Sequence, residues 1–250
     1  MSNQNSATEA RDASHWAKTV SKLHVGDVSA LAAGVNVEGK QLTGPLRGFG
    51  QMWQRTFRVR LPGVNLKPAE VIKAWRENFP TFWPKGNKFY GSVSKGIAPG
   101  EVAVLHLGEV GGQPLMSTGI YVIYADDESF AFMTPEGHPI AGMNTFSAFL
   151  DPDDCLTAQV QCLLRAGDPI YEIGMKFFGM KKHEDEFWLH TMKALAAHFG
   201  VDAKPEYVET LVDPKWQWKQ AKNIWHNAGA RTALYTLAAP LRRLRKRGKA

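Results

Sequence analysis

Hydrophobic and polar residues alternate with a period of two in several short segments of the chain. In the clearest segment, 56–61, Phe57, Val59 and Leu61 fall on one side and two arginines on the other, which is typical of a half-buried strand. Clusters of glycine, proline and aspartate separate six further predicted strands, at 88–94, 102–108, 115–124, 129–134, 142–150 and 156–166. Because links this short cannot hold parallel crossovers, the strands are predicted to be mostly antiparallel.

A helix is predicted between the first strand and the other six. It begins at Pro68, its apolar residues Val71, Trp75 and Phe79 share one face, and Pro80 ends it. The predicted order is therefore one strand, a helix and six strands.

The longest amphipathic segment, 168–199, follows the last strand. Its apolar residues Trp188, Met192, Leu195 and Phe199 recur at steps of three and four, which places them on one helix face. An aspartate and a proline open the segment and a glycine follows it, which are common start and stop signals of a helix. The strands offer the large apolar surface that such a helix must cover. We therefore predict an α+β fold, in which a curved antiparallel sheet of about seven strands wraps around one long C-terminal helix.

Three parts of the chain differ in pattern. Residues 1–45 have no sustained periodicity and are predicted to be a flexible lead-in, whereas residues 46–201 hold the predicted domain. Residues 202–250 are predicted to be a helical extension with a basic tail. Within this extension, 205–212 is interpreted as a connector or a short helix, and 214–228 as a second amphipathic piece.

The composition favours one large domain with a substantial core, because 44% of the 250 residues are hydrophobic. No uninterrupted run of about 18 apolar residues occurs, so no membrane-spanning helix is expected. The N-terminus is polar and lacks the apolar core of a secretion signal. Cys155 and Cys162 lie too far apart along one extended strand to form a disulfide. We therefore expect a reduced, cytoplasmic protein.

The net charge of +6 is concentrated at the C-terminus. Residues 231–250 contain seven lysines and arginines and no acidic residue, so the rest of the chain is nearly neutral. Nucleic acid is therefore not expected as a partner of the folded domain. The tail has two interpretations. One is a membrane-peripheral adaptor at the inner membrane surface, which contacts anionic lipid through Arg242, Arg243, Arg245, Lys246 and Arg247. The alternative is a basic end that stays in solution.

One predicted turn reads Thr-Pro-Glu-Gly-His-Pro at 134–139 and is followed by Gly142 and Phe146. Together with the order of strands and helices, it resembles an uncharacterised bacterial branch of the SRPBCC superfamily, which includes START and birch-allergen-like domains. Other matching positions are Gly48-Phe49-Gly50, Trp53, Phe79, Trp83-Pro84 and Pro99-Gly100-Glu101. The resemblance covers residues 46–201. It implies the helix-grip fold and an interior cavity for an apolar ligand, and it supplies no catalytic residues.

Aromatic and methionine side chains are frequent among the residues that we expect to line such a cavity. A pocket of this composition suits a flexible or lipid-like molecule. The candidate lining residues are Trp75, Phe79, Phe82, Trp83, Phe89, Met133, Met143, Phe146, Phe177, Phe178 and Trp188. The alternative for each is an ordinary place in the hydrophobic core. Together they predict a carrier, sensor or storage protein for a small hydrophobic ligand, with the oligomeric state left open.

His138 is the main candidate for chemistry. It lies in the turn, two residues after Glu136, and Pro139 fixes the next backbone angle. As a general base or as a polar contact to the ligand, it would make the protein a cyclase- or hydrolase-like enzyme. The alternative is that its ring bonds to the backbone and stabilises the turn.

The motifs for metal, cofactor and nucleophile sites are incomplete. The fourth residue after His183 is Phe187 rather than a second histidine, so the acidic run 184–186 is interpreted as a solvated helix face and not as a zinc site. No P-loop and no Gly-x-Ser-x-Gly sequence occurs, and the Gly-Phe-Gly at 48–50 lacks the third glycine of a dinucleotide loop. We expect no metal and no cofactor.

Overall fold

Residues 13–26, 28 and 36–238 are described by the computed structural model of the chain. They form 3-10 helices (η), α-helices (α) and strands (β) in the following order: η1 (Pro45–Arg47), β1 (Met52–Arg60), α2 (Pro68–Asn78), η2 (Phe79–Phe82), β2 (Lys88–Tyr90), β3 (Val102–Val110), β4 (Gln113–Ala125), β5 (Ser129–Met133), β6 (Ile140–Leu150), β7 (Leu156–Ala166), α3 (Pro169–Phe177), α4 (Met180–His198), β8 (Glu206–Asp213), η3 (Trp218–His226) and α5 (Ala228–Leu237).

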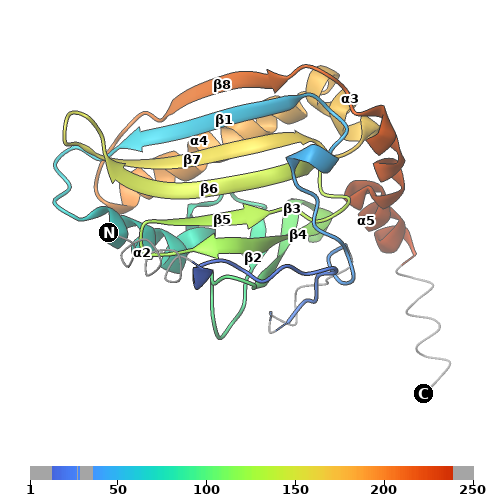
Figure 1. Cartoon of the computed structure of the whole chain (residues 1–250), viewed down its shortest axis with the longest axis horizontal. Coiled ribbons are helices and arrows are strands. Elements are labelled where there is room, and N and C mark those ends of the chain that lie inside the picture. Colours follow the sequence, from blue (N-terminus) through green and yellow to red (C-terminus); the bar gives the residue numbers. More distant parts are fainter. Residues whose placement is uncertain (1–12, 27, 29–35, 239–250) are drawn as a thin grey trace, which may run out of the picture.

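The strands of the described chain form one eight-stranded sheet in the order β2-β3-β4-β5-β6-β7-β1-β8. Every neighbouring pair is antiparallel. The sheet is curved, with α4 packed behind β1 and β7 and α2 packed on β6 and β7 (Figure 1). This is the helix-grip arrangement, so the predicted fold class is confirmed, and the sheet has one strand more than predicted.

The alternation predicted for the first strand is confirmed. Phe57 and Val59 are buried on the inner face, whereas Arg58 and Arg60 are exposed on the outer face. The strand begins earlier than predicted. Arg55 is therefore part of the strand. It lies two residues before Phe57, so its side chain also points to the inner face.

The prediction of a single long helix after β7 is wrong, because the segment forms two helices, α3 and α4. The chain turns between them at Gly179, whose φ of 72° lies in the left-handed region that favours glycine. The start signal acts as predicted, since the Asp168 carboxylate accepts two backbone N–H bonds from the first turn of α3. Trp188, Met192 and Leu195 are buried on α4. The apolar spacing of three and four residues therefore describes α4 and does not extend to α3.

The prediction of a connector or short helix at 205–212 is also wrong. This segment belongs to β8, which pairs with β1 at the edge of the sheet. On the inner face, Tyr207 stacks on Phe57 with 4.9 Å between the ring centroids. The apolar residues of β8 occur in adjacent pairs, which hides the strand from a search for alternation. The sheet therefore extends beyond the predicted domain range of 46–201.

Part of the predicted lead-in packs on the outer face of the sheet. Leu23 and Val37 are fully buried in a small cluster with Val104 and Tyr121. Next to them, the buried Asn36 amide donates hydrogen bonds to the backbone of β4 and α5. The described part of residues 1–45 is therefore joined to the domain, which corrects the prediction of a flexible lead-in.

The end of the described chain is formed by η3 and by α5, which packs on β4 (Figure 1). The predicted amphipathic piece 214–228 thus contains a 3-10 helix and not one α-helix. Among the described residues, no helix is long and apolar enough to cross a membrane. The predicted lipid contacts Arg242, Arg243, Arg245, Lys246 and Arg247 lie outside the described residues.

Candidate functional site

Aromatic side chains fill the space between the sheet and the helices α2 and α4. Phe79 is central, because its ring lies 5.2 to 5.7 Å from five other aromatic rings, all at steep angles. Such edge-to-face contacts are favourable beyond the burial of area. We call the connected rings the aromatic cluster: Trp75, Phe79, Trp83, Phe89, Phe130, Phe132, Phe146, Phe187 and Trp188.

Seven of the predicted lining residues belong to this interior. Trp75, Phe79, Phe82, Phe146 and Trp188 are buried core residues, and Trp83 and Phe89 are half-buried against the core. The aromatic cluster therefore occupies the place where the sequence predicts a ligand.

The other predicted apolar residues lie elsewhere. Met133 and Met143 are paired across β5 and β6. The buried phenylalanines of these strands are at even positions and the two methionines at odd positions, so the methionine side chains lie on the outer face. Phe177 and Phe178 are 75% and 77% exposed at the end of α3. The prediction that these four residues line the interior is therefore wrong. The strand register places the two methionines on the outer face, and the break between α3 and α4 leaves the two phenylalanines at the surface.

Two polar groups in the aromatic cluster have no partner. The indole nitrogens Nε1 of Trp75 and Trp83 are buried, and neither has a hydrogen-bond acceptor among the described residues. An indole N–H only donates, and leaving it buried and unpaired costs free energy. The aromatic cluster therefore holds two donors that an added carbonyl or hydroxyl oxygen can satisfy.

The aromatic cluster leaves little open space. Four pockets of the described chain are lined by other residues and by no member of the cluster. Its deepest members, Trp75, Phe79 and Phe146, are completely buried. The interior is thus closed, and a ligand must displace protein side chains to enter it.

His138 is held by its own turn. The Ile140 backbone N–H donates to His138 Nδ1 at 3.1 Å. Burial lowers the pKa of His138 to about 4, so its ring is neutral at pH 7. The pocket beside it measures about 10 Å³, which is room for no more than one water molecule. This geometry favours the second of the two predicted roles, in which His138 stabilises the turn.

The pKa of His138 predicts a pH dependence of stability. Because burial lowers this pKa from 6.5 to about 4, the stabilisation is complete above pH 6.5 and is lost as the pH falls through about 4. We expect the free energy of unfolding to fall from pH 6.5 to 4.5 in the natural chain and to fall less in His138→Asn. Urea unfolding at each pH measures it, with the exposed His183→Asn as control. Equal slopes in all three proteins would show that His138 does not titrate as described.

A charged cluster lies inside the sheet beside α4. The Arg55 side chain is 2% exposed, and its guanidinium donates to Glu184 at 2.8 Å and lies 3.5 Å from Asp185. Glu209 of β8 is 3.8 Å from Arg55 and 2.8 Å from Lys181. The prediction of a solvated face for 184–186 is therefore wrong for its first two residues. Their partner was missed because the predicted strand began after Arg55.

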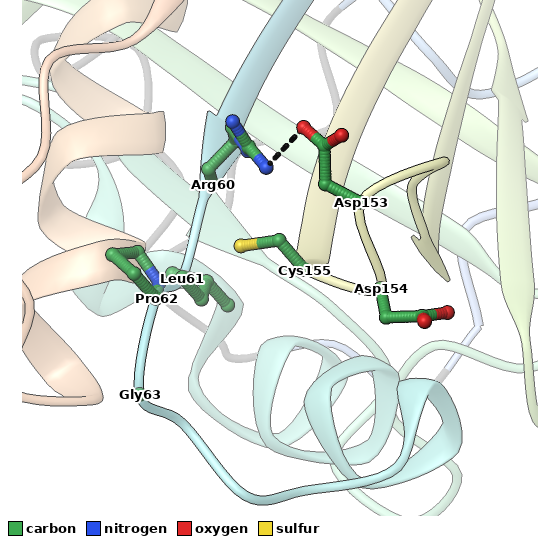
Figure 2. Close-up of a pocket in the computed structure, with 7 residues that line it drawn as sticks. All are labelled: Arg60, Leu61, Pro62, Gly63, Asp153, Asp154 and Cys155. Carbon is green, nitrogen blue, oxygen red and sulfur yellow. Dashed lines mark hydrogen bonds and ion pairs between the residues drawn. The ribbon is translucent and has the colours of Figure 1, made fainter.

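A surface pocket of about 430 Å³ lies where β1 ends beside the β6–β7 turn (Figure 2). Arg60 forms an ion pair with Asp153 at 2.9 Å, while Asp154 points away from it (Figure 2). The Cys155 thiol donates weakly to the backbone carbonyl of Leu156. The Cys155 backbone N–H donates to Asp151 Oδ1, so these contacts serve the turn.

A second pocket, of about 300 Å³, lies on the outer face between β2, β3, β4 and α5. His106 lines it, and the buried Nε2 of this histidine has no hydrogen-bond partner among the described residues. Burial, with the charge of Lys88, lowers the pKa of His106, so its ring is neutral at pH 7. Sequence reasoning missed this site, because a single histidine in a strand gives no signal.

The described residues contain no group of three histidine, cysteine, aspartate or glutamate side chains that could hold a metal ion. His183 is exposed on α4, while Glu184 turns inward to Arg55. The side chains of His183 and Glu184 therefore point in different directions and do not converge on one metal position.

Several solved structures of known proteins align with part of this chain. A START superfamily protein from Mycobacterium smegmatis aligns over 60% of this chain and 98% of its own, with 22% identity and a TM-score of 0.40. The major latex-like protein 151 of Panax ginseng aligns over 60% and 99%, with 14% identity and a TM-score of 0.37. The di-domain ARO/CYC StfQ from the steffimycin biosynthetic pathway aligns over 60% and 53%, with 7% identity and a TM-score of 0.44.

No protein-family profile matches the chain, and no curated protein matches it. At the identities of the structural neighbours the likeness concerns the fold. The helix-grip assignment itself rests on the strand order and on the position of α4 against the sheet.

Proposed function

We propose that the protein binds a small, mainly apolar molecule carrying a hydrogen-bond acceptor, inside the aromatic cluster, as a carrier, sensor or storage protein. The observation that supports this proposal is the pair of buried indole N–H groups of Trp75 and Trp83 without acceptors among the described residues. The rings around them supply the apolar surface, and the two N–H groups supply direction and selectivity.

The route of entry follows from the burial of the cluster. Trp83 and Phe89 are its half-buried members at the edge, and the Trp83 ring touches Phe187 of α4 at 5.0 Å between centroids. Movement of Trp83 away from α4 breaks its ring contacts with Phe79 and Phe187 and opens the cluster at this edge. The bound molecule then lies between η2, β2 and α4.

A matched pair of probes tests the proposal. 2-Acetylnaphthalene carries a carbonyl acceptor, whereas 2-ethylnaphthalene has nearly the same shape and no acceptor. A hydrogen bond to a buried unpaired donor is worth roughly 1–3 kcal/mol, so we expect the ketone to bind about tenfold more tightly. Quenching of tryptophan fluorescence measures both affinities.

The variant Trp83→Phe replaces the indole by a phenyl ring and so keeps an aromatic side chain without the N–H. We expect it to reduce the preference for the ketone. Trp225→Phe is the control, because Trp225 is 80% exposed on η3. If neither probe binds up to its solubility limit, or if the preference is unchanged in Trp83→Phe and in Trp75→Phe, the interior is not the site. Mass spectrometry of an organic extract of the purified protein should also reveal a co-purifying apolar compound.

A further inference from the structure

One end of the molecule exposes large apolar side chains. At this end α3, η3 and α5 lie together, where β7 and β8 finish (Figure 1). Six side chains on them are each more than two-thirds exposed: Phe177, Phe178, Trp218, Trp225, Leu234 and Leu237. We call this surface the apolar end. Exposed apolar patches of this kind in folded proteins mark sites of interaction.

The fold holds the apolar end in place. The Phe49 carbonyl accepts a hydrogen bond from the Gln217 backbone, and the Phe49 ring meets Trp218 edge to face at 5.4 Å. The Asn223 side chain donates to the carbonyls of Arg47 and Gly167. The exposure of the tryptophans is therefore set by buried and hydrogen-bonded neighbours.

From residue 214 on, the sequence carries charge of one sign. Residues 214–250 contain ten lysines and arginines and no acidic residue. Lys215, Lys219, Lys222 and Arg231 are described and exposed, and the other six follow α5 directly in the sequence. In addition, Lys176 Nζ lies 4.7 Å from the centroid of the Trp216 ring. Lys219 and Lys222 thus lie on the same helix as Trp218 and Trp225, and Arg231 lies on the same helix as Leu234 and Leu237.

This combination identifies one kind of partner. Lysine is depleted in interfaces between proteins, whereas tryptophan with lysine is typical of surfaces that lie in the headgroup region of a membrane. Sequence-independent nucleic-acid binding uses aromatic rings along a basic groove, and the exposed leucines of α5 have no role there. We propose that the apolar end docks on an anionic lipid bilayer, with Trp218, Trp225 and Leu237 in the interface and Lys215, Lys219, Lys222 and Arg231 against the headgroups. This proposal is independent of ligand binding in the aromatic cluster.

Flotation with lipid vesicles tests the docking surface on the full chain. Vesicles of phosphatidylcholine alone are compared with anionic vesicles that contain about 30 mol% phosphatidylglycerol. We expect binding to the anionic vesicles only, and a loss of about tenfold or more in partition coefficient for Lys219→Glu/Lys222→Glu. Trp225→Ser/Leu237→Ser should lose a similar amount through its apolar contacts.

The matched control is Val93→Ser/Leu150→Ser, which removes two exposed apolar side chains outside the apolar end and should bind as the natural chain does. Because all these positions are exposed, thermal unfolding should be nearly unchanged in every variant. Equal binding of Trp225→Ser/Leu237→Ser and its control would overturn the proposal. So would no vesicle binding together with binding of poly(U), or a stable dimer that buries these tryptophans.

Discussion

Replacing Arg55 by methionine should lower the free energy of unfolding by about 3–5 kcal/mol at pH 7. Arg55 is the cation that faces Glu184 and Asp185 inside the sheet, and its side chain is only 2% exposed. Methionine fills a similar volume but leaves three carboxylates, those of Glu184, Asp185 and Glu209, with Lys181 as the remaining cation of the described cluster. Removing one partner of a buried pair exposes the other to the full cost of desolvation.

The sign of the pH dependence identifies the cause of this loss. Burial raises the pKa of Glu184, and the charge of Arg55 opposes that rise, so the pKa of Glu184 will rise further in Arg55→Met. A carboxyl whose pKa is raised by folding stabilises the fold at low pH and loses that contribution as the pH rises through its folded pKa. The difference between Arg55→Met and the natural chain should therefore shrink from pH 7.5 to pH 5.5, as measured by urea unfolding.

Arg58→Met is the matched control for this experiment. Arg58 lies on the same strand, points to the outer face and donates to Gln159 there. We expect a change within about 0.5 kcal/mol, since exposed substitutions of this kind are usually small. A similar loss in both arginine variants, or a loss in Arg55→Met that does not depend on pH, would contradict the assigned role of the charged cluster.

Phe79→Ala should lower the free energy of unfolding by about 3–5 kcal/mol. Phe79 is completely buried, and its ring contacts five others in the aromatic cluster. Its removal loses the transfer energy of the ring and leaves a cavity that the surrounding rings cannot close without losing their edge-to-face geometry. Phe177→Ala removes the same side chain from a site that is 75% exposed and should change little.

The cavity left by Phe79→Ala offers a second measurement. An apolar cavity of the size of a phenyl ring binds benzene, and a ligand that binds only the folded state raises stability. Benzene should therefore raise the unfolding midpoint of Phe79→Ala and leave that of the natural chain unchanged. If benzene stabilises both equally, the interior already holds open space, and the packing of the aromatic cluster is looser than described.

The sequence predicted the parts of the fold that a local pattern specifies. Phe57 and Val59 alternate with exposed arginines, and Asp168 opens a helix, because strand parity and helix capping depend on near neighbours along the chain. β8 was missed because its apolar residues come in pairs and its pairing partner, β1, is far away in sequence. The break at Gly179 was missed because one glycine within an amphipathic run signals a stop only weakly.

The candidate site was predicted less well, for a related reason. Trp75, Phe79 and Phe146 lie in the interior, as the helix and strand patterns predict. Whether that interior is open or closed depends on how all the rings pack together, which no local pattern reports. Met133 and Met143 were assigned to the wrong face, since a strand register cannot be fixed when both parities contain apolar residues. The unpaired indole groups are a property of three-dimensional packing, and no sequence pattern reports them.

The two outermost strands bear on self-assembly of this protein. A free sheet edge is a template on which further chains can add and grow into fibrils. Here one edge strand, β2, is only three residues long, and the other, β8, carries Glu206, Glu209 and Asp213 within eight residues. Copies that approach edge to edge therefore meet either a strand too short to extend or a strand that carries charged side chains. Both open margins of the sheet are thus protected against amyloid-like growth at high concentration.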